Sequence, residues 1–125
     1  MEILHIPATP TTPLISFNSE TGVFEISGKS THENPVVFYE PVIQWLHDYS
    51  KMANKNTSLL INLMYFNTSS SKCLLDVFRK MKQITQIGGN VVIKWQYEQG
   101  DEDMQEAGAD YAAILELPFE FIEQP

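Results

Sequence analysis

The spacing of apolar residues along the chain changes several times, and each change predicts a switch between strand and helix. Strands are predicted at Leu14–Phe17 and Val23–Ser27, which flank a turn sequence and form an antiparallel hairpin. The nearly continuous apolar run from Ser58 to Phe66 predicts a central strand that is covered on both faces. Two further strands are predicted at Asn90–Tyr97 and Phe119–Ile122.

Helices are predicted between these later strands. Asn34-Pro35 is a typical helix start, and helical spacing continues to about Met52. Pro41 lacks the N–H that a helix interior needs, so a short turn is expected first, followed by a kink or a fresh start at Glu40-Pro41. The clearest helix covers residues 69–87, and a shorter one covers residues 101–111, where Gly108 is unfavourable.

The predicted order of elements is ββαβαβαβ over a single domain, residues 1–125. Strands that alternate with helices favour a mostly parallel sheet, to which the first hairpin adds an antiparallel edge. Residues 1–13 contain three prolines, Pro7, Pro10 and Pro13, and are expected to form an extended arm or edge. The fold class is therefore α/β with a mixed sheet.

Charge and composition narrow the classes of partner. The formal net charge is −8, so the chain should repel nucleic acid and anionic membrane surfaces, and basic partners are favoured. Cys73 is the single cysteine, which excludes an internal disulfide and is typical of a reducing compartment. The first residues lack the pattern of a signal peptide, and a cytoplasmic location is expected.

The segment from Tyr65 to Lys72 joins the most apolar strand to the clearest helix and contains four hydroxyl residues in a row, starting at Thr68. Ligand and regulatory sites of open α/β sheets tend to lie at such strand ends. Thr68 has two interpretations at this point. It is either only an N-cap, which contributes about 1 kcal/mol, or a phosphorylation site where a phosphate would be stabilised by the helix N-terminus.

Three blocks of the sequence resemble the SiaC family of regulatory phosphoproteins, whose fold is similar to the STAS fold of anti-sigma-factor antagonists. The blocks are Ile26–Ser30 with Glu33 and Asn34, Tyr65–Lys72, and Trp95–Glu98 with the acidic stretch that follows. The similarity covers nearly the whole chain. The Asn-Thr-Ser-Ser block at residues 67–70 is its most specific part, and Thr68 falls on the phosphorylation site of the family.

This resemblance implies a STAS-like sandwich and a partner-switching adaptor rather than an enzyme. It implies a kinase related to anti-sigma factors, which would use its own ATP and magnesium, and a PP2C-like phosphatase. The unphosphorylated form would bind a target such as a diguanylate cyclase, which places the chain in c-di-GMP signalling and biofilm regulation. No cofactor or metal is expected. Residues expected to frame Thr68 or contact partners are Glu33, Asn34, Asn67, Ser69, Ser70 and Lys72.

Two alternatives remain open from the sequence. The first is a constitutive binding module in which Thr68 is only a cap, Asn34 is another cap and Glu33 is solvated. The second is a small enzyme that uses Cys73 or a metal held by Glu102 and Glu106, which share a helical face. The three histidines are scattered, and Cys73 is expected to be a buried structural thiol. The acidic segment from Asp101 to Glu106 departs from the best-known branch of the family and leaves the target undefined.

Overall fold

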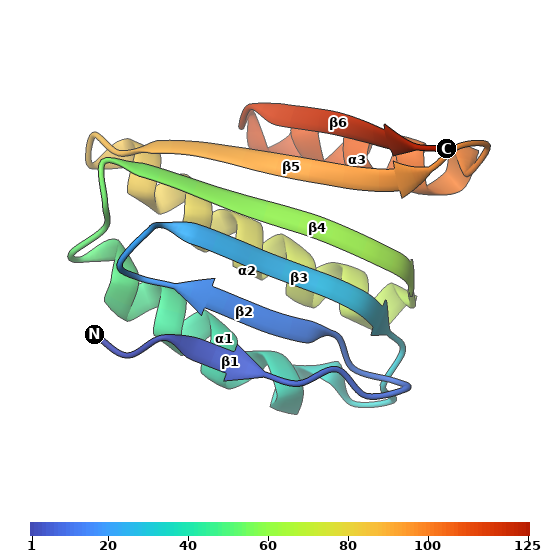
Figure 1. Ribbon diagram of the computed structural model, residues 1–125, viewed down its shortest axis with the longest axis horizontal. Coiled ribbons are helices and arrows are strands. Elements are labelled where there is room, and N and C mark those ends of the chain that lie inside the picture. Colours follow the sequence, from blue (N-terminus) through green and yellow to red (C-terminus); the bar gives the residue numbers. More distant parts are fainter.

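The computed structural model describes all residues, 1–125, as a six-stranded mixed sheet with three helices (Figure 1). Along the chain the elements are β1 (Leu4–Ile6), β2 (Leu14–Asn18), β3 (Val23–Ser30), α1 (Pro35–Ser50), β4 (Asn56–Phe66), α2 (Thr68–Gln86), β5 (Asn90–Glu98), α3 (Glu102–Leu115) and β6 (Phe119–Gln124). The strands lie side by side in sequence order, antiparallel from β1 to β3 and parallel from β3 to β6. The predicted α/β class with a mixed sheet is confirmed.

All three helices pack on the same face of the sheet, and the opposite face is open (Figure 1). Each helix joins neighbouring parallel strands, and because such crossovers are right-handed, successive ones in a sheet that grows in one direction fall on one side. The expectation that β4 is covered on both faces was therefore wrong. Leu59, Ile61 and Leu63 of β4 are buried beneath the helices, whereas Leu60 is half-buried and Met64 exposed.

The core lies between the sheet and the helix layer. Its largest fully buried side chains include Trp95, Tyr39, Tyr49 and Phe24. Cys73 is also buried there and is a free thiol, as expected for a structural cysteine.

The beginning of the chain contains a strand that was not predicted. Residues Leu4–Ile6 pair antiparallel with Ile15–Phe17 and form the outer edge of the sheet, so the observed order is βββαβαβαβ. Proline lacks a backbone donor and therefore belongs at such an edge, and Pro7 directly follows the short strand.

The predicted break at Pro41 is absent, because α1 continues from Pro35 to Ser50 with Pro41 inside it. Pro41 is exposed, and so is Val37, whose carbonyl would accept the missing hydrogen bond. Water can satisfy that carbonyl, which makes the proline tolerable. Gly108 likewise does not shorten α3, because it packs directly against the indole of Trp95.

Candidate functional site

The candidate site lies at the carboxyl ends of β3 and β4, where α1 and α2 begin. The pairing of these strands shifts register between Gly28 and Lys29, so that Met64 is an extra residue on β4. Such a bulge re-aims the side chains that follow it. Both Met64 and the next residue, Tyr65, are exposed as a result, at 64% and 59%.

Asn67 is the residue that caps α2. Its Oδ1 accepts a hydrogen bond from the N–H of Ser70 at 2.8 Å. Its Nδ2 donates to the carbonyl of His32 at 3.3 Å, and its own N–H donates to the carbonyl of Ser30 at 3.1 Å. Asn67 thus fastens the start of α2 to the end of β3 and to the loop that leads into α1. The interpretation of Thr68 as the N-cap was wrong, because the cap lies one residue earlier.

Thr68 is the first residue of α2 and is exposed. Its hydroxyl makes no hydrogen bond within the chain, whereas its carbonyl accepts one from the Ser71 hydroxyl at 2.6 Å. The first N–H groups of a helix have no partner within the helix, and here only that of Ser70 is capped by a side chain. An exposed hydroxyl therefore stands beside free N–H groups that favour an anion.

Ser70 is fully buried, in contrast to Thr68 and Ser69, which are both exposed. Its hydroxyl accepts a hydrogen bond from Ser30 at 2.8 Å, and Ser30 is in turn bonded to the Tyr39 hydroxyl at 2.8 Å. This chain of hydroxyls links α2, β3 and α1 beneath the loop. Burial raises the pKa of Tyr39 to about 12, although the bond to Ser30 acts in the opposite direction. Ser70 thus supports the loop from inside and, being fully buried, offers no exposed surface, in contrast to the expectation that it contacts partners.

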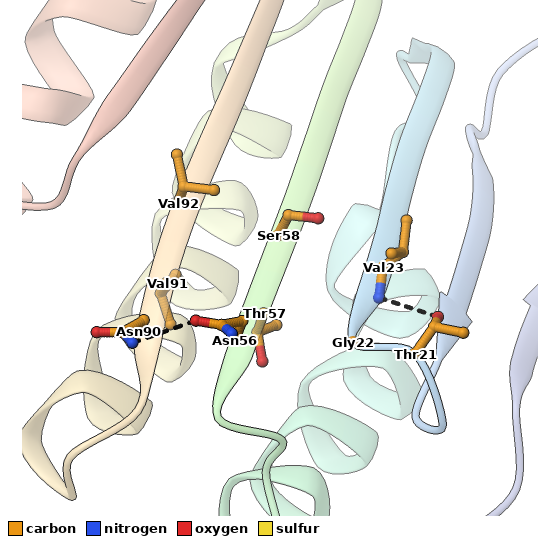
Figure 2. Close-up of a pocket in the computed structure, with 9 residues that line it drawn as sticks. All are labelled: Thr21, Gly22, Val23, Asn56, Thr57, Ser58, Asn90, Val91 and Val92. Atoms are coloured by element: carbon orange, nitrogen blue, oxygen red, sulfur yellow. Dashed lines mark hydrogen bonds between the residues drawn. The ribbon is translucent and has the colours of Figure 1, made fainter.

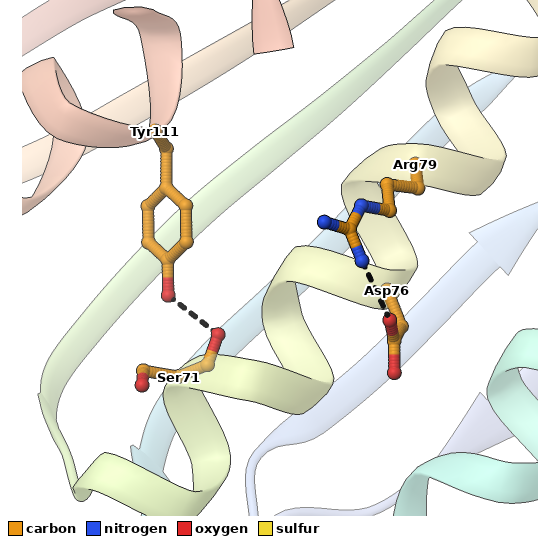
Figure 3. Close-up of polar contacts among 4 residues, drawn as sticks. All are labelled: Ser71, Asp76, Arg79 and Tyr111. Carbon is orange, nitrogen blue, oxygen red and sulfur yellow. Dashed lines mark hydrogen bonds and ion pairs between the residues drawn. The ribbon is translucent and has the colours of Figure 1, made fainter. Parts of the chain in front are cut away.

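The third helix also supports the first turn of α2. The Tyr111 hydroxyl donates to the carbonyl of Ser71 at 2.8 Å (Figure 3). Burial raises the pKa of Tyr111 above its usual value, so this donor stays protonated further into the alkaline range than an exposed tyrosine would. Further along α2, Arg79 Nη1 lies 3.6 Å from Asp76 Oδ1. This exposed ion pair, also drawn in Figure 3, contributes little to stability.

The remaining predicted site residues lie around this turn. Glu33 and Asn34 belong to the loop of residues 31–34, which Asn67 binds through the carbonyl of His32. Both are exposed, and Asn34 occupies the N-cap position of α1 without a capping bond from its side chain. Lys72 is exposed one turn into α2 and makes no ion pair.

Sequence reasoning missed Met64 and Tyr65 as surface residues, because an apolar run gives no sign of a bulge. It also missed Ser30 and Tyr111 as supports of the loop. Their hydrogen bonds join positions forty residues apart. A glycine at the bulge was the available signal, since Gly28 has a φ of 111°, a conformation that other residues rarely adopt.

Other candidate chemistry is not assembled by the fold. No group of three or more His, Cys, Asp or Glu side chains is placed to hold a metal ion, so Glu102 and Glu106 gain no further ligand. Burial raises the pKa of the Cys73 thiol, helped by the charge of Asp76, and this disfavours a reactive thiolate. None of the helices is long and apolar enough to span a membrane.

A shallow pocket of about 250 Å³ lies at the other end of the sheet, where the parallel strands begin (Figure 2). Asn56 and Asn90 face each other there across β4 and β5, with a side-chain hydrogen bond of 3.2 Å. Gly22 closes one side with Thr21 and Val23. The pocket contains no ionisable side chain and lies far from Thr68, at the opposite ends of the same strands.

Comparison with known proteins gives consistent matches over nearly the whole chain. The family described as "SiaC family regulatory phosphoprotein" matches residues 6–124. An uncharacterized protein of Pseudomonas aeruginosa strain UCBPP-PA14 is 29% identical over 119 residues, which cover 95% of this chain and 94% of the relative.

Solved structures agree with the sequence matches. The crystal structure of apo-SiaC from Pseudomonas aeruginosa is similar with a TM-score of 0.88 and 28% identity, over 98% of this chain and 99% of that one. A second similar structure is that of the diguanylate cyclase SiaD in complex with its activator SiaC, from the same species. The match has a TM-score of 0.89 and 28% identity, and it covers 97% of this chain and 99% of the other.

Proposed function

Because the chain belongs to the SiaC family of regulatory phosphoproteins, we propose that it is a phosphorylation-controlled adaptor whose switch residue is Thr68. In its unphosphorylated form it binds and modulates a target protein, which we take to be a diguanylate cyclase. The solved complex of SiaC with the diguanylate cyclase SiaD supports this choice of target.

The observation that carries the proposal is the free, exposed hydroxyl of Thr68 at the first position of α2. Since Asn67 supplies the cap, Thr68 is not needed to start the helix. A kinase can therefore modify this hydroxyl without breaking a hydrogen bond of the fold. The phosphate would add a charge of about −1.5 to −2 next to free N–H groups at the positive end of the helix dipole.

The switch then works through the surface and leaves the fold intact. The loop beneath Thr68 is held by Asn67 and by the buried bond between Ser30 and Ser70, neither of which involves the Thr68 side chain. A target surface fitted to a neutral hydroxyl would have to accommodate and desolvate a phosphate. Lys72, one turn further on, is exposed and able to approach the phosphate. Glu33, Asn34 and Ser69 share the exposed rim of the same contact.

The proposal includes the enzymes that set the phosphorylation state, a kinase related to anti-sigma factors and a PP2C-like phosphatase. The chemistry belongs to them, and this chain acts as their substrate. All of these proteins would meet in the cytoplasm.

The direct test is mass spectrometry of the protein purified from its native cells, with and without phosphatase treatment. We expect one phosphate on Thr68, which disappears in Thr68→Ala. Ser69→Ala is the matched control, because Ser69 is the exposed neighbouring hydroxyl and should leave phosphorylation unchanged. A phosphate on Ser69, or none after incubation with ATP and cell lysate, would contradict the proposed site and favour a constitutive binding module.

The second test compares binding of the two forms to the diguanylate cyclase of the same organism. The unphosphorylated protein should bind at least ten-fold more tightly than the protein phosphorylated at Thr68. Equal binding of both forms would show that the modification does not control this partner.

A further inference from the structure

A groove with a volume of about 260 Å³ opens beside Thr68, between the end of β4 and the first turns of α3. Its walls and floor are mostly apolar, with Met64, Tyr65 and Phe66 on one side and Met104 and Ala107 on the other. Met64 and Tyr65 are among the most exposed large apolar residues of the chain. Methionine side chains adapt to different partners, so two of them at one groove suit a protein-binding surface.

The groove exists because β4 and β5 separate before β4 ends. Their pairing stops at Ile61 and Trp95, whereas β4 continues to Phe66. Past that point β5 pairs only with β6, so this side of β4 has no neighbouring strand. The bulge at Met64 lies in this unpaired stretch and turns its side chain and that of Tyr65 outward.

The groove also carries negative charge that no lysine or arginine of the chain balances. Asp101 and Asp103 line it, and it contains no lysine or arginine. Asp101 Oδ1 accepts the N–H of Met104 at 3.0 Å, which caps α3, and Asp103 is exposed. The single ion pair of the chain is between Arg79 and Asp76. Asp101 and Asp103 therefore have no cationic side chain as a partner.

We propose that this groove is the anchoring surface for the target, which inserts an apolar side chain between Met64 and Met104 and places a lysine or arginine beside Asp101 and Asp103. Charge complementarity favours a basic segment of a partner protein as the occupant of the groove. A second copy of this chain would bring another net charge of −8, whereas a basic segment is attracted. The groove is continuous with the switch, because Phe66 lines it and Thr68 follows two residues later.

This inference rests on the proposed function and names the chemistry of the partner contact. The groove anchors the target when Thr68 is unphosphorylated, and a phosphate on Thr68 weakens this contact because the adjoining surface can no longer close. A phosphate acts there through its bulk and its hydration shell, which a close contact would have to remove.

Site-specific photo-crosslinking in native cells tests the proposal with the full chain. The photoreactive residue p-benzoylphenylalanine replaces Tyr65 in one strain and Ile114 in a control strain. Ile114 is similarly exposed, at 64% against 59% for Tyr65, but does not line the groove. In a third strain, p-benzoylphenylalanine replaces Val37, which is 65% exposed and lies on α1, away from the groove lining. Cross-linked peptides are then identified by mass spectrometry.

We expect cross-links from position 65, and not from 114, to a segment that has an apolar residue and a lysine or arginine within a few positions. Adding Asp101→Asn and Asp103→Asn should lower the cross-link yield at least five-fold, because asparagine keeps the cap but removes the charge. Circular dichroism confirms that each variant is folded.

Cross-links from position 65 to a second copy of this chain, or to a segment without basic residues, would overturn the proposal. Capture of the target through position 37 but not through position 65 would also overturn it, as would no capture at all or a cross-link yield that is unchanged in the Asp variants. The experiment also distinguishes failure of the groove proposal from failure of the proposed Thr68 switch. Contact at position 65 regardless of Thr68 phosphorylation would keep the groove and refute the switch, whereas phosphorylation-dependent contact elsewhere would keep the switch and refute the groove.

Discussion

At the scale of single residues, the site depends on Asn67, whose side-chain amide is bonded within the fold. Asn67 supplies the cap of α2 and the link to His32 through the two atoms of one amide group. We predict that Asn67→Ala lowers the free energy of unfolding by about 1 kcal/mol or more, because the Ser70 N–H loses its acceptor. Urea unfolding at neutral pH measures this change.

Two further variants, Asn67→Asp and Thr68→Ala, test whether Asn67 rather than Thr68 is the cap of α2. Asn67→Asp keeps an oxygen that can cap the helix and should cost less than Asn67→Ala. Thr68→Ala should change the free energy of unfolding by less than about 0.5 kcal/mol, because its hydroxyl makes no bond in the fold. A larger cost for Thr68→Ala than for Asn67→Ala would show that Thr68 is the cap after all.

Gly108 illustrates a residue whose importance is opposite to its helix propensity. Alanine is favoured over glycine within a helix by about 1 kcal/mol. A Cβ at this position, however, would lie 2.7 Å from Trp95 Cδ1 and Nε1. The indole cannot retreat easily, since Nε1 donates to the Met104 carbonyl at 2.9 Å and the ring is fully buried. We predict that Gly108→Ala lowers the free energy of unfolding by about 1–3 kcal/mol.

The control for Gly108→Ala is Ala109→Gly on the exposed side of α3, which measures propensity alone. It should cost about 1 kcal/mol. Thermal unfolding of both variants, with tryptophan fluorescence as the probe, reports stability and the environment of Trp95. A stabilising Gly108→Ala would mean that the helix and the sheet can move apart at no cost.

At the scale of elements, sequence periodicity predicted most strands and helices, and it failed where long-range contacts decide. The helical spacing of Leu74, Val77, Phe78 and Met81 is preserved in the buried face of α2. By contrast, the run of residues 58–66 predicts even burial, because the alternation between buried and less buried positions cannot be recognised when both faces of a strand carry apolar residues. The bulge at Met64 depends on register with β3, which no local pattern encodes. The candidate site was therefore predicted from its motif, whereas the groove beside it was not predicted.

Pro41 offers a test at the element scale of how α1 tolerates a missing donor. Restoring an N–H at this exposed position allows a bond to the Val37 carbonyl and removes the clash of the ring with that turn. We predict that Pro41→Ala raises the free energy of unfolding by about 1 kcal/mol, after allowance for the more flexible unfolded chain. Chemical denaturation measures it.

Glu40→Ala is the control for Pro41→Ala, because Glu40 is the exposed neighbour within the same helix. It should change stability by less than about 0.5 kcal/mol. A destabilising Pro41→Ala would indicate that the proline ring makes contacts that outweigh the lost hydrogen bond.

At the scale of the whole molecule, the sequence predicted the order of the later elements but not the one-sided arrangement of the helices. That arrangement follows from strand order, since neighbouring parallel strands in sequence order send each crossover to the same side. It leaves one sheet face open and places α1 and α3 on either side of α2 (Figure 1). Tyr39 of α1 and Tyr111 of α3 both lie in the core. Those two tyrosines are buried as a consequence, and they tie the stability of the domain to pH.

Burial raises the pKa of Tyr39 to about 12, from an ordinary value of 10.0, and also raises that of Tyr111. The folded state thus holds these protons more tightly than the unfolded state. The stabilisation is complete below pH 10 and is lost as the pH rises toward the folded pKa values. Each group contributes a slope of up to about 1.4 kcal/mol per pH unit in this window, so the free energy of unfolding should fall by up to about 2.7 kcal/mol per unit.

Tyr39→Phe should remove up to about 1.4 kcal/mol per pH unit from that alkaline slope, because Tyr39 no longer titrates, whereas Tyr111 and the Cys73 thiol, whose pKa burial also raises, remain. It also breaks the bond to Ser30, so some stability is lost at neutral pH as well, and the slope rather than the absolute value is the readout. Tyr65→Phe is the matched control, since Tyr65 is 59% exposed in the folded protein and meets water in both states. Urea denaturation between pH 8 and about pH 11.5 measures all three proteins. An unchanged slope in Tyr39→Phe would mean that the hydroxyl beneath the switch loop is reached by water, and that the chain of hydroxyls from Tyr39 to Ser70 is open to solvent rather than sealed by the fold.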